Sequence, residues 1–244
     1  MTRHRARLGC IVPATNSAVE AEWRRLDRDD VTLHAARVPF TATVAGLQGF
    51  REHAARAAAL LTAEGMCDLI AVCCTMASLL GEPGAEKRLT DELAGEAGVP
   101  VVSTGGAVLA ALAAVGARRV AVGTPYTRPI DDAERAALEG SGLEVRRLVS
   151  LHERLDPAAL TNRLIADVPA ERVRALARDA DEPAAEALLL SCTNLYTIAL
   201  VPALESELGK PVVSSNGATY WYCLRRLGVT ERLPALGRLG ALPI

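Results

Sequence analysis

The chain has 244 residues, of which 50% are hydrophobic, and a formal net charge of −2 at pH 7. This length is enough to form a sizeable core in one large domain or two smaller ones, and the composition excludes a disordered chain. The near balance of charge argues against a nucleic-acid partner, and no apolar run is long enough to span a bilayer.

Short apolar runs alternate with longer amphipathic segments along the chain. The apolar runs typical of buried strands cover residues 7–13, 31–39, 68–74, 99–104, 118–125, 143–151, 187–192 and 210–215. Helical patterns lie between them at residues 17–26, 49–64, 85–97, 105–116, 128–140, 169–180, 197–208 and 217–227. This alternation predicts an α/β fold with parallel sheets that helices cover on both faces. Ser17 and Glu20 have the spacing of a capping box, which predicts a helix start there.

Three segments of the first half recur in the second half in the same order. GVPVVSTGGA and GKPVVSSNGA, which begin at residues 98 and 209, are identical at seven of ten positions and lie 111 residues apart. RLGCIVPAT from residue 7 shares Arg, Pro and Thr with RVAVGTPYT, 112 residues later. DLIAVCCTM from residue 68 shares Cys-Thr with EALLLSCTN, 118 residues later. Three matches in register indicate an internal repeat.

The repeat predicts two similar α/β lobes, related by a pseudo-twofold axis and facing each other across a cleft. We expect residues 1–105 and 217–244 to form the N-terminal lobe, and residues 106–216 to form the C-terminal lobe. In open α/β sheets ligands bind beyond the carboxyl ends of the strands. The active site is therefore expected in the cleft between the lobes.

Cys74 and Cys192 end equivalent strands of this repeat, so the two thiols are expected to face one cleft from opposite sides. Helix N-termini and backbone N–H groups lower the pKa of a thiol, so that one thiolate would accept a proton or attack a carbon while the opposite thiol donates a proton. Thr75 and Thr193 follow the two cysteines, and each adds a hydroxyl and an N–H group suited to a carboxylate or an enediolate.

Cysteine is also a common small core residue, and a structural role is the alternative for both thiols. For Cys10, Cys67, Cys73 and Cys223 this alternative is the preferred interpretation. Cys73 and Cys74 are neighbours on a strand and must point to opposite faces. The repeat selects Cys74, because the Cys-Thr pair recurs at Cys192.

The sequence argues against metal or cofactor chemistry. The cysteines lack C-x-x-C spacing and the histidines are scattered, which disfavours a zinc site. The two lysines, Lys87 and Lys210, lie in polar surroundings unsuited to Schiff-base chemistry, and no glycine-rich phosphate-binding motif is present. The basic N-terminus lacks the apolar segment of a signal peptide. We therefore expect a cytoplasmic protein that works with side chains alone, without cofactor, metal or membrane.

The motifs IVPATNSAVEAE, GTPYTRPIDD and LLLSCTNLYTIALVPALESELGKPVVSSNGATYW, with Cys-Thr after the third strand, resemble the Asp/Glu racemase superfamily. Within it the chain is most similar to the branch of maleate cis-trans isomerases and arylmalonate decarboxylases. The resemblance covers nearly the whole chain. It implies two α/β lobes with the site between them, no cofactor, a small carboxylate substrate, and pairing into a homodimer.

The resemblance also implies roles for individual residues. Cys74 would be the nucleophile and Cys192 the opposing acid, while Asn16, Tyr126 and Asn162 would hold the two carboxylates of the substrate. From the residues alone, the alternatives are that Asn16 caps a helix, that Tyr126 follows Pro125 in a turn, and that Asn162 lies on the surface. Asn16 and Tyr126 follow strands that are equivalent in the repeat, which favours the substrate roles for these two, whereas Asn162 lies in a stretch that matches the repeat poorly. Decarboxylases of this branch have glycine at the position of Cys74, so the two cysteines favour isomerase or racemase chemistry.

The leading hypothesis is a cofactor-independent isomerase of a small dicarboxylate, with maleate to fumarate as the concrete case. A two-cysteine racemase or epimerase of an amino or hydroxy acid is the first alternative. A malonate decarboxylase that uses Cys192 alone is the second. A carboxylate-binding protein without catalysis is a further alternative, in which neither thiol would matter for turnover.

Overall fold

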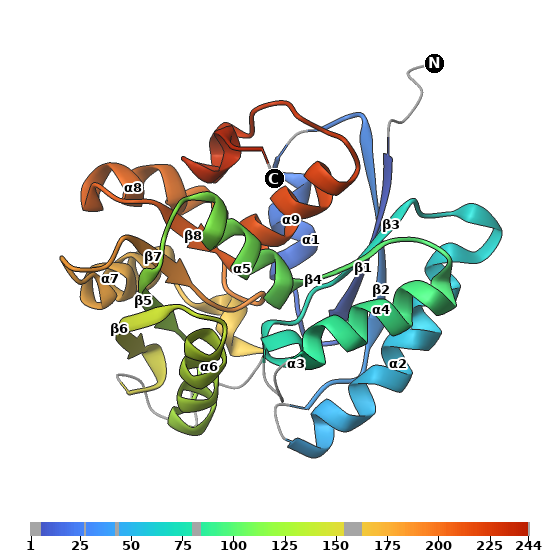
Figure 1. Cartoon of the computed structure of the whole chain (residues 1–244), viewed down its shortest axis with the longest axis horizontal. Helices are drawn as coiled ribbons and strands as arrows, with labels where there is room; N and C mark the ends of the chain where they lie inside the picture. The colour runs from blue at the N-terminus through green and yellow to red at the C-terminus, as the bar shows by residue number, and fades with distance from the viewer. Residues whose placement is uncertain (1–5, 27, 42–43, 80–83, 154–162, 244) are drawn as a thin grey trace.

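The computed structural model describes residues 6–26, 28–41, 44–79, 84–153 and 163–243, which form two four-stranded parallel sheets (Figure 1). The first sheet has the order β2-β1-β3-β4, formed by Val31–Val38, Ala6–Pro13, Leu69–Val72 and Val101–Ser103. The second has the order β6-β5-β7-β8, formed by Glu144–Ser150, Arg119–Thr124, Ala187–Leu190 and Val212–Ser214. The α/β class is confirmed, and the repeated strand order gives the sequence repeat a structural basis.

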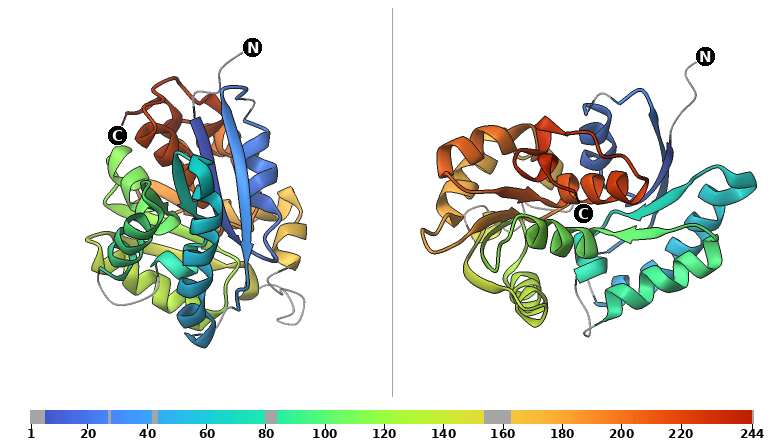
Figure 2. Two further views of the ribbon diagram at one scale, coloured as in Figure 1. Left: turned by 90° about the vertical axis from the view of Figure 1, so that its right-hand side faces the viewer. Right: turned by 45° about the horizontal axis from the view of Figure 1, so that its top comes forward.

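Helices cover both faces of each sheet, as Figure 2 shows from two further directions. In the first lobe α2 (Val44–Thr62) and α4 (Ala85–Ala97) pack together on one face, and α1 (Ala18–Arg24) lies on the other. In the second lobe α7 (Ala170–Ala180) and α8 (Val201–Leu208) pack together, opposite α6 (Arg128–Gly140). Between the sheets, α5 (Thr104–Ala114) and α9 (Ser215–Arg226) pack side by side.

Short 3₁₀ turns aside, the strands and helices agree with the prediction to within about five residues at their ends, and two helical segments near the thiols differ from it. The short helix α3 (Thr75–Leu79) follows β3 directly and was not predicted, because its length is too short to show a helical period. The helix predicted over residues 197–208 begins as a separate 3₁₀ turn, Ile198–Leu200, and continues as α8. Both exceptions lie close to the two strand ends that carry the thiols.

The start of α1 is capped by Asn16 and not by the predicted capping box. Ser17 makes no side-chain cap hydrogen bond, whereas Asn16 Oδ1 accepts hydrogen bonds from the next two N–H groups of the helix, at 3.0 and 3.2 Å. Glu20 instead forms an ion pair with Arg37 of β2. The contact with Arg37 joins two opposite charges, whereas a capping-box bond would join the carboxylate to a neutral N–H group.

The repeated Val-Val-Ser segments form equivalent helix starts in the two lobes. Ser103 Oγ accepts a hydrogen bond from Gly106 N at 3.0 Å, and Ser214 Oγ accepts one from Gly217 N at 3.2 Å. These serines are the N-caps of α5 and α9. A Cβ atom at Gly217 would lie only 2.9 Å from Ser214 Oγ, so the close cap requires glycine at this position.

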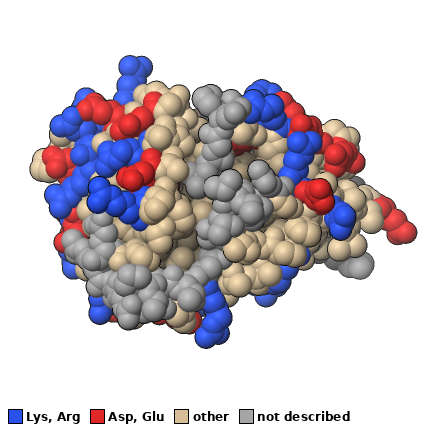
Figure 3. Space-filling view, turned by 90° about the horizontal axis from the view of Figure 1, so that it is seen from below, with Lys and Arg blue, Asp and Glu red and all other residues tan. Residues whose placement is uncertain are grey.

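All strands of the first sheet lie within residues 6–103, and those of the second lie within 119–214. The predicted lobe limits, 1–105 with 217–244 and 106–216, stay a prediction. Helices α5 and α9 contact each other and a strand of each sheet, so the strands alone do not assign these two helices to one lobe. On the face shown in Figure 3, positive and negative side chains are interspersed. Among the described helices, none is both long and apolar enough to cross a membrane.

Candidate active site

Cys74 and Cys192 lie just beyond the carboxyl ends of β3 and β7, the equivalent strands of the two sheets. Each residue is 4% exposed, and both line a single small pocket of about 20 Å³. That volume corresponds to about one water molecule, so the pocket is narrow in this conformation. The structure therefore brings together the two thiols that the sequence repeat singled out.

Cys73 points away from this pocket, as the alternation of side chains along a strand requires. It is packed in the same buried cluster as Cys10 and Cys223, on the opposite face of the first sheet. Cys74 belongs to the other cluster, together with Cys192 and Tyr126. The two adjacent cysteines thus have different environments, and the repeat distinguished them correctly.

Neutral side chains line the pocket around the two thiols. The polar lining residues are Asn16, Thr75, Tyr126, Thr193 and Asn194, and the apolar wall consists of Pro13, Phe40 and Met76. As far as the structure describes the chain, no Lys, Arg or His contributes to this lining. Asn162, the remaining predicted substrate residue, lies outside the described residues. The other six predicted site residues line this one pocket: Asn16, Cys74, Thr75, Tyr126, Cys192 and Thr193. This is the arrangement expected from the repeat and the resemblance.

Burial dominates the electrostatics of both thiols. It raises the pKa of Cys74 to about 12, although the N–H groups of Met76 and Ala77 at the start of α3 favour the thiolate. Burial likewise raises the pKa of Cys192 to about 11, against the Tyr126 hydroxyl and the N–H group of Asn194, whose nitrogen is 3.3 Å from the sulfur. The predicted N–H groups are present, but the desolvation of the buried sulfur atoms outweighs them.

Cys192 has a backbone φ of 151°, in a region that residues other than glycine rarely adopt. Such conformations cost about 1–3 kcal/mol and persist where the surroundings hold them. Ser215, the first residue of α9, provides one restraint, because its Oγ accepts a hydrogen bond from Cys192 N at 3.1 Å. The strained backbone of Cys192 is thus held by α9, the helix that packs between the two sheets.

The hydroxyls of the two threonines are engaged in contacts within the protein. Thr75 Oγ1 donates a hydrogen bond to Ser215 Oγ at 3.2 Å, and Thr193 Oγ1 donates one to Cys73 O at 3.2 Å. The first bond joins the chain after Cys74 to α9. The second joins the chain after Cys192 to the chain just before Cys74 in the other lobe. Ser215 was not singled out from the sequence. It directly follows the repeated Val-Val-Ser motif, at a position where the first copy has another hydroxyl residue, Thr104, and this match is a signal that would have found it.

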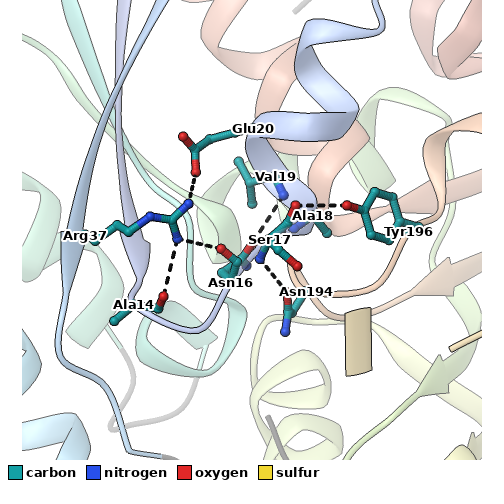
Figure 4. Close-up of polar contacts among 9 residues, drawn as sticks. All are labelled: Ala14, Asn16, Ser17, Ala18, Val19, Glu20, Arg37, Asn194 and Tyr196. Carbon is teal, nitrogen blue, oxygen red and sulfur yellow. Dashed lines mark hydrogen bonds and ion pairs between the residues drawn. The ribbon is translucent and has the colours of Figure 1, made fainter. Parts of the chain in front are cut away.

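Asn16 has two roles at once. Its Oδ1 caps α1, while its Nδ2 donates a hydrogen bond to Thr193 Oγ1 at 3.2 Å. An asparagine amide has two N–H donors, so one remains for a ligand in the pocket. Figure 4 shows how the same loop meets the second lobe: Ser17 N donates to Asn194 Oδ1 at 3.0 Å, and the Tyr196 hydroxyl donates to Ser17 O at 2.9 Å.

Tyr126 is fixed in place through its main chain. Its N–H group donates a hydrogen bond to Thr124 Oγ1 at 3.3 Å, and its carbonyl oxygen accepts one from Ser150 Oγ. Burial raises the pKa of Tyr126 well above its ordinary value, so the side chain is a phenol and a hydrogen-bond donor at neutral pH. Its hydroxyl interacts with Cys192, which places a proton donor beside that thiol.

The chain belongs to the arylmalonate decarboxylase family, whose family model matches residues 8–240. It is 30% identical to the maleate isomerase of Nocardia farcinica, over 96% of this chain and 94% of that protein. It is 28% identical to the arylmalonate decarboxylase of Bordetella bronchiseptica, over 95% of each chain. The predicted resemblance to the Asp/Glu racemase superfamily, and to this branch of it, is confirmed.

A solved structure of the Nocardia farcinica maleate cis-trans isomerase has the same fold. It is a cysteine-to-serine variant with a covalently bound succinylcysteine intermediate, and its TM-score against this chain is 0.86 at 28% identity. The match covers 97% of this chain and 98% of that one. This protein therefore shares its fold with an isomerase in which a cysteine carries a covalent intermediate.

Proposed function

We propose that this protein is a cofactor-independent isomerase of a small dicarboxylate, with the conversion of maleate to fumarate as the concrete reaction. The observation that carries the proposal is the pair of buried thiols, Cys74 and Cys192, in one pocket of neutral hydrogen-bond donors. The similarity to proteins named maleate isomerase, one of them with a succinylcysteine intermediate, supports it.

In the proposed reaction the Cys74 thiolate adds to one carbon of the substrate double bond. The π electrons move to the neighbouring carbon and into its carboxylate, which becomes an enediolate, and Cys192 donates a proton to that carbon. The product is a succinyl thioether in which the former double bond is a single bond and rotates. Cys192 then removes the proton, the carbon–sulfur bond breaks, and the trans dicarboxylate leaves with the Cys74 thiolate restored.

The substrate carboxylates would be held by neutral donors. In this proposal Asn16 supplies its remaining N–H donor, Tyr126 its hydroxyl, and Thr75 and Thr193 the N–H groups next to the thiols. The hydroxyls of the two threonines already donate hydrogen bonds within the protein, Thr75 to Ser215 Oγ and Thr193 to Cys73 O, each at 3.2 Å. Asn162 stays part of the proposal on the resemblance alone. Neutral hydrogen-bond donors stabilise an enediolate, and they bind the dianionic product less tightly than cationic side chains would.

The same proposal includes a cytoplasmic location, a homodimer, and catalysis without cofactor or metal. These points rest on the sequence and on the family resemblance. The binding of a small carboxylate is supported by the family and by the similarity to a maleate isomerase with a bound succinylcysteine intermediate.

Proton NMR of the purified protein in D₂O tests the proposal, with maleate, aspartate, glutamate and phenylmalonate as candidate substrates. We expect fumarate to appear from maleate and this activity to be lost in Cys74→Ala. Cys73→Ala is the matched control, because Cys73 lies in the buried cluster on the other face of the sheet. Deuterium entry at an α-carbon without maleate turnover would replace the proposal by a racemase, and a decarboxylated product by a malonate decarboxylase.

A further inference from the structure

Glu22 is a buried carboxyl group of α1 that the proposed reaction does not use. Its Oε1 accepts hydrogen bonds from Thr197 N and Ile198 N, each at 2.6 Å. Its Oε2 accepts one from Asn216 Nδ2, also at 2.6 Å. Burial raises the pKa of Glu22, and these three donors oppose the rise. A carboxyl group is costly to bury unless donors of this kind surround it, so the three contacts define the role of Glu22 in the fold.

Two of the donors belong to the start of a 3₁₀ turn in the other lobe. The turn Ile198–Leu200 begins directly after Thr197, and N–H groups at the start of a helix have no partner within that helix. Thr197 precedes the turn but makes no side-chain cap hydrogen bond. Glu22 supplies the missing acceptor from α1. The chain that leads from β7 to this turn is therefore anchored, at its far end, to a helix of the first lobe.

The third donor, Asn216 of α9, connects Glu22 to the residue that follows Cys192. The same Nδ2 atom also donates a hydrogen bond to Thr193 O at 3.0 Å, and Trp23 Nε1 donates one to Asn216 O at 3.1 Å. These surroundings fix the orientation of the amide, because a reversed amide would place its oxygen against the oxygens of Glu22 and Thr193. In the part of the chain that the structure describes, Asn216 Oδ1 is buried without a partner. The fold thus uses the donors of this amide and leaves its acceptor unused.

Residues 191–197, here called the Cys192 loop, connect β7 to the 3₁₀ turn and are held at two points by this network. Asn216 holds the loop at Thr193, and Glu22 holds it at Thr197. Between these points the backbone decides the surroundings of the thiol: Cys192 has a φ of 151°, and Asn194 N lies 3.3 Å from its sulfur. A conformation of this kind persists only where the surroundings hold it. Release of the loop would therefore move the thiol and its neighbouring N–H groups together.

We propose that Glu22 is a positioning residue that holds the Cys192 loop, and with it the Cys192 thiol, in the geometry that the pocket requires. Its effect on turnover rests on the proposed function. Its effect on the loop does not, because the accessibility of Cys192 is measurable without a substrate. Glu22 acts through Asn216 and through the N–H groups of Thr197 and Ile198, and it does not itself line the pocket of the two thiols.

The variant Glu22→Gln tests the inference, because glutamine has nearly the same shape as glutamate but only one acceptor oxygen. If this oxygen keeps the N–H groups of Thr197 and Ile198, the amide nitrogen faces Asn216 Nδ2, donor against donor. A reversed Asn216 amide would not relieve this conflict, since its oxygen would then face Thr193 O. We therefore expect the variant to release the Cys192 loop at one of its two points without a change of side-chain volume.

The measurement is peptide-resolved alkylation of the full-length protein by iodoacetamide at one pH, with the rate at Cys192 divided by the rate at Cys10 in the same sample. Cys10 is fully buried in β1 and reports the opening of the whole protein. In Glu22→Gln this ratio should rise about tenfold or more, because the loss of buried hydrogen bonds to a charged group favours local opening. The kcat for maleate should fall about tenfold or more, because catalysis is sensitive to small displacements of a reacting group.

Glu205→Gln is the matched control. Glu205 of α8 is also a buried carboxyl group that accepts hydrogen bonds from main-chain N–H groups, those of Val212 at 3.0 Å and Arg238 at 2.8 Å. Neither donor belongs to the Cys192 loop. This variant should lose stability, yet its alkylation ratio and its kcat should stay within about twofold of the wild type. Asn216→Ala, which removes the link to Thr193, carries the same predictions as Glu22→Gln if that variant does not fold.

Three results would overturn the inference. The first is an unchanged alkylation ratio in Glu22→Gln, and the second is the same rise in Glu205→Gln, which would indicate general destabilisation. The third is a raised ratio with an unchanged kcat, which would give Glu22 a role in stability alone. Absence of maleate turnover in the wild type would instead reject the proposed function, and the alkylation ratio would still decide whether Glu22 holds the Cys192 loop. The two failures are therefore distinguishable.

Discussion

The hydroxyl of Thr193 donates a hydrogen bond to the carbonyl oxygen of Cys73, 3.2 Å away, and so joins the chain beside one candidate catalytic thiol to the chain beside the other. Thr193 follows Cys192 after the second sheet, and Cys73 precedes Cys74 after the first. The same hydroxyl accepts a hydrogen bond from Asn16. This buried contact fixes how the two strand ends meet.

Thr193→Val should therefore destabilise the protein. Valine has nearly the same shape as threonine, but it leaves the Cys73 carbonyl and an Asn16 N–H group without this partner. We expect the free energy of unfolding to fall by about 1–3 kcal/mol, as measured by urea denaturation. Thr62→Val is the control, because Thr62 is half-buried and bonds only within α2, and it should cost about 0.5 kcal/mol or less. Equal losses of stability in the two variants would show that the hydrogen bond between Thr193 and Cys73 contributes no more than a bond within one helix.

Substitutions of Asn16 should separate its cap from its proposed contact with the substrate. In Asn16→Ala the loss of the cap is expected to cost about 1 kcal/mol of stability. Asn16→Asp retains an oxygen that caps α1, so its stability should stay closer to that of the wild type. The aspartate, however, places a negative charge in the pocket, and KM for a dicarboxylate should rise about tenfold or more. Unchanged KM in Asn16→Asp would remove Asn16 from the substrate site.

The backbone of Cys192 predicts an inverted order of stability for two substitutions. At a φ of 151° glycine is unstrained, so Cys192→Gly should be more stable than Cys192→Ala by about 1 kcal/mol. At Cys74, which has no positive φ, the usual order should hold and Cys74→Ala should be the more stable variant. Thermal or urea unfolding of the four variants measures both orders. If alanine is preferred at both positions, the strain at Cys192 is absent.

Glu134 predicts a pH dependence of stability with a definite sign. Because its pKa is about 7 in the folded protein and 4.5 is the ordinary value, the unfolded chain releases this proton at lower pH than the folded protein does. The stability from this group is thus complete below about pH 4.5 and is lost as the pH rises through 7. Relative to the wild type, Glu134→Gln should gain roughly 2–4 kcal/mol between pH 4.5 and 8.

The matched control for this titration is Glu207→Gln. The pKa of Glu207 is lowered by its hydrogen bond with Arg178, so both the folded and the unfolded states are ionised above about pH 6. Its stability difference from the wild type should stay nearly constant between pH 6 and 8. A constant difference for Glu134→Gln as well would mean that Glu134 does not titrate as a buried acid.

Much of the site was predictable from the sequence, because the repeat carries geometric information. Equivalent strands of two parallel sheets end at equivalent places, so the repeat alone is enough to pair Cys74 with Cys192. The same argument covers Thr75 and Thr193, which lie in the repeated Cys-Thr pairs. The helix start after Asn16 was also predicted, and of the two caps that the sequence offered, Asn16 and the Ser17 capping box, the structure has Asn16.

Other features depend on tertiary packing and leave little trace in the sequence. Glu134 and Asp131 belong to the polar residues of an amphipathic helix pattern, which ordinarily indicates a solvated face. In the structure both are buried, because they face hydroxyls at the ends of β5 and β7. The raised pKa of both thiols likewise comes from burial in the folded protein, and the φ of Cys192 is a feature of the backbone that its residue type does not predict.

The most direct test of the central claim is peptide mapping by mass spectrometry after incubation of Cys192→Ser with maleate. In Cys192→Ser the serine hydroxyl or water supplies the proton of the addition step, but no thiolate remains to remove that proton again. The adduct should therefore accumulate, and the peptide with Cys74 should gain the mass of one maleic acid. The double variant Cys74→Ala, Cys192→Ser should gain none. Fumarate formation by the wild type with no adduct at Cys74 in Cys192→Ser, or an adduct confined to another cysteine such as Cys67, would contradict Cys74 as the nucleophile.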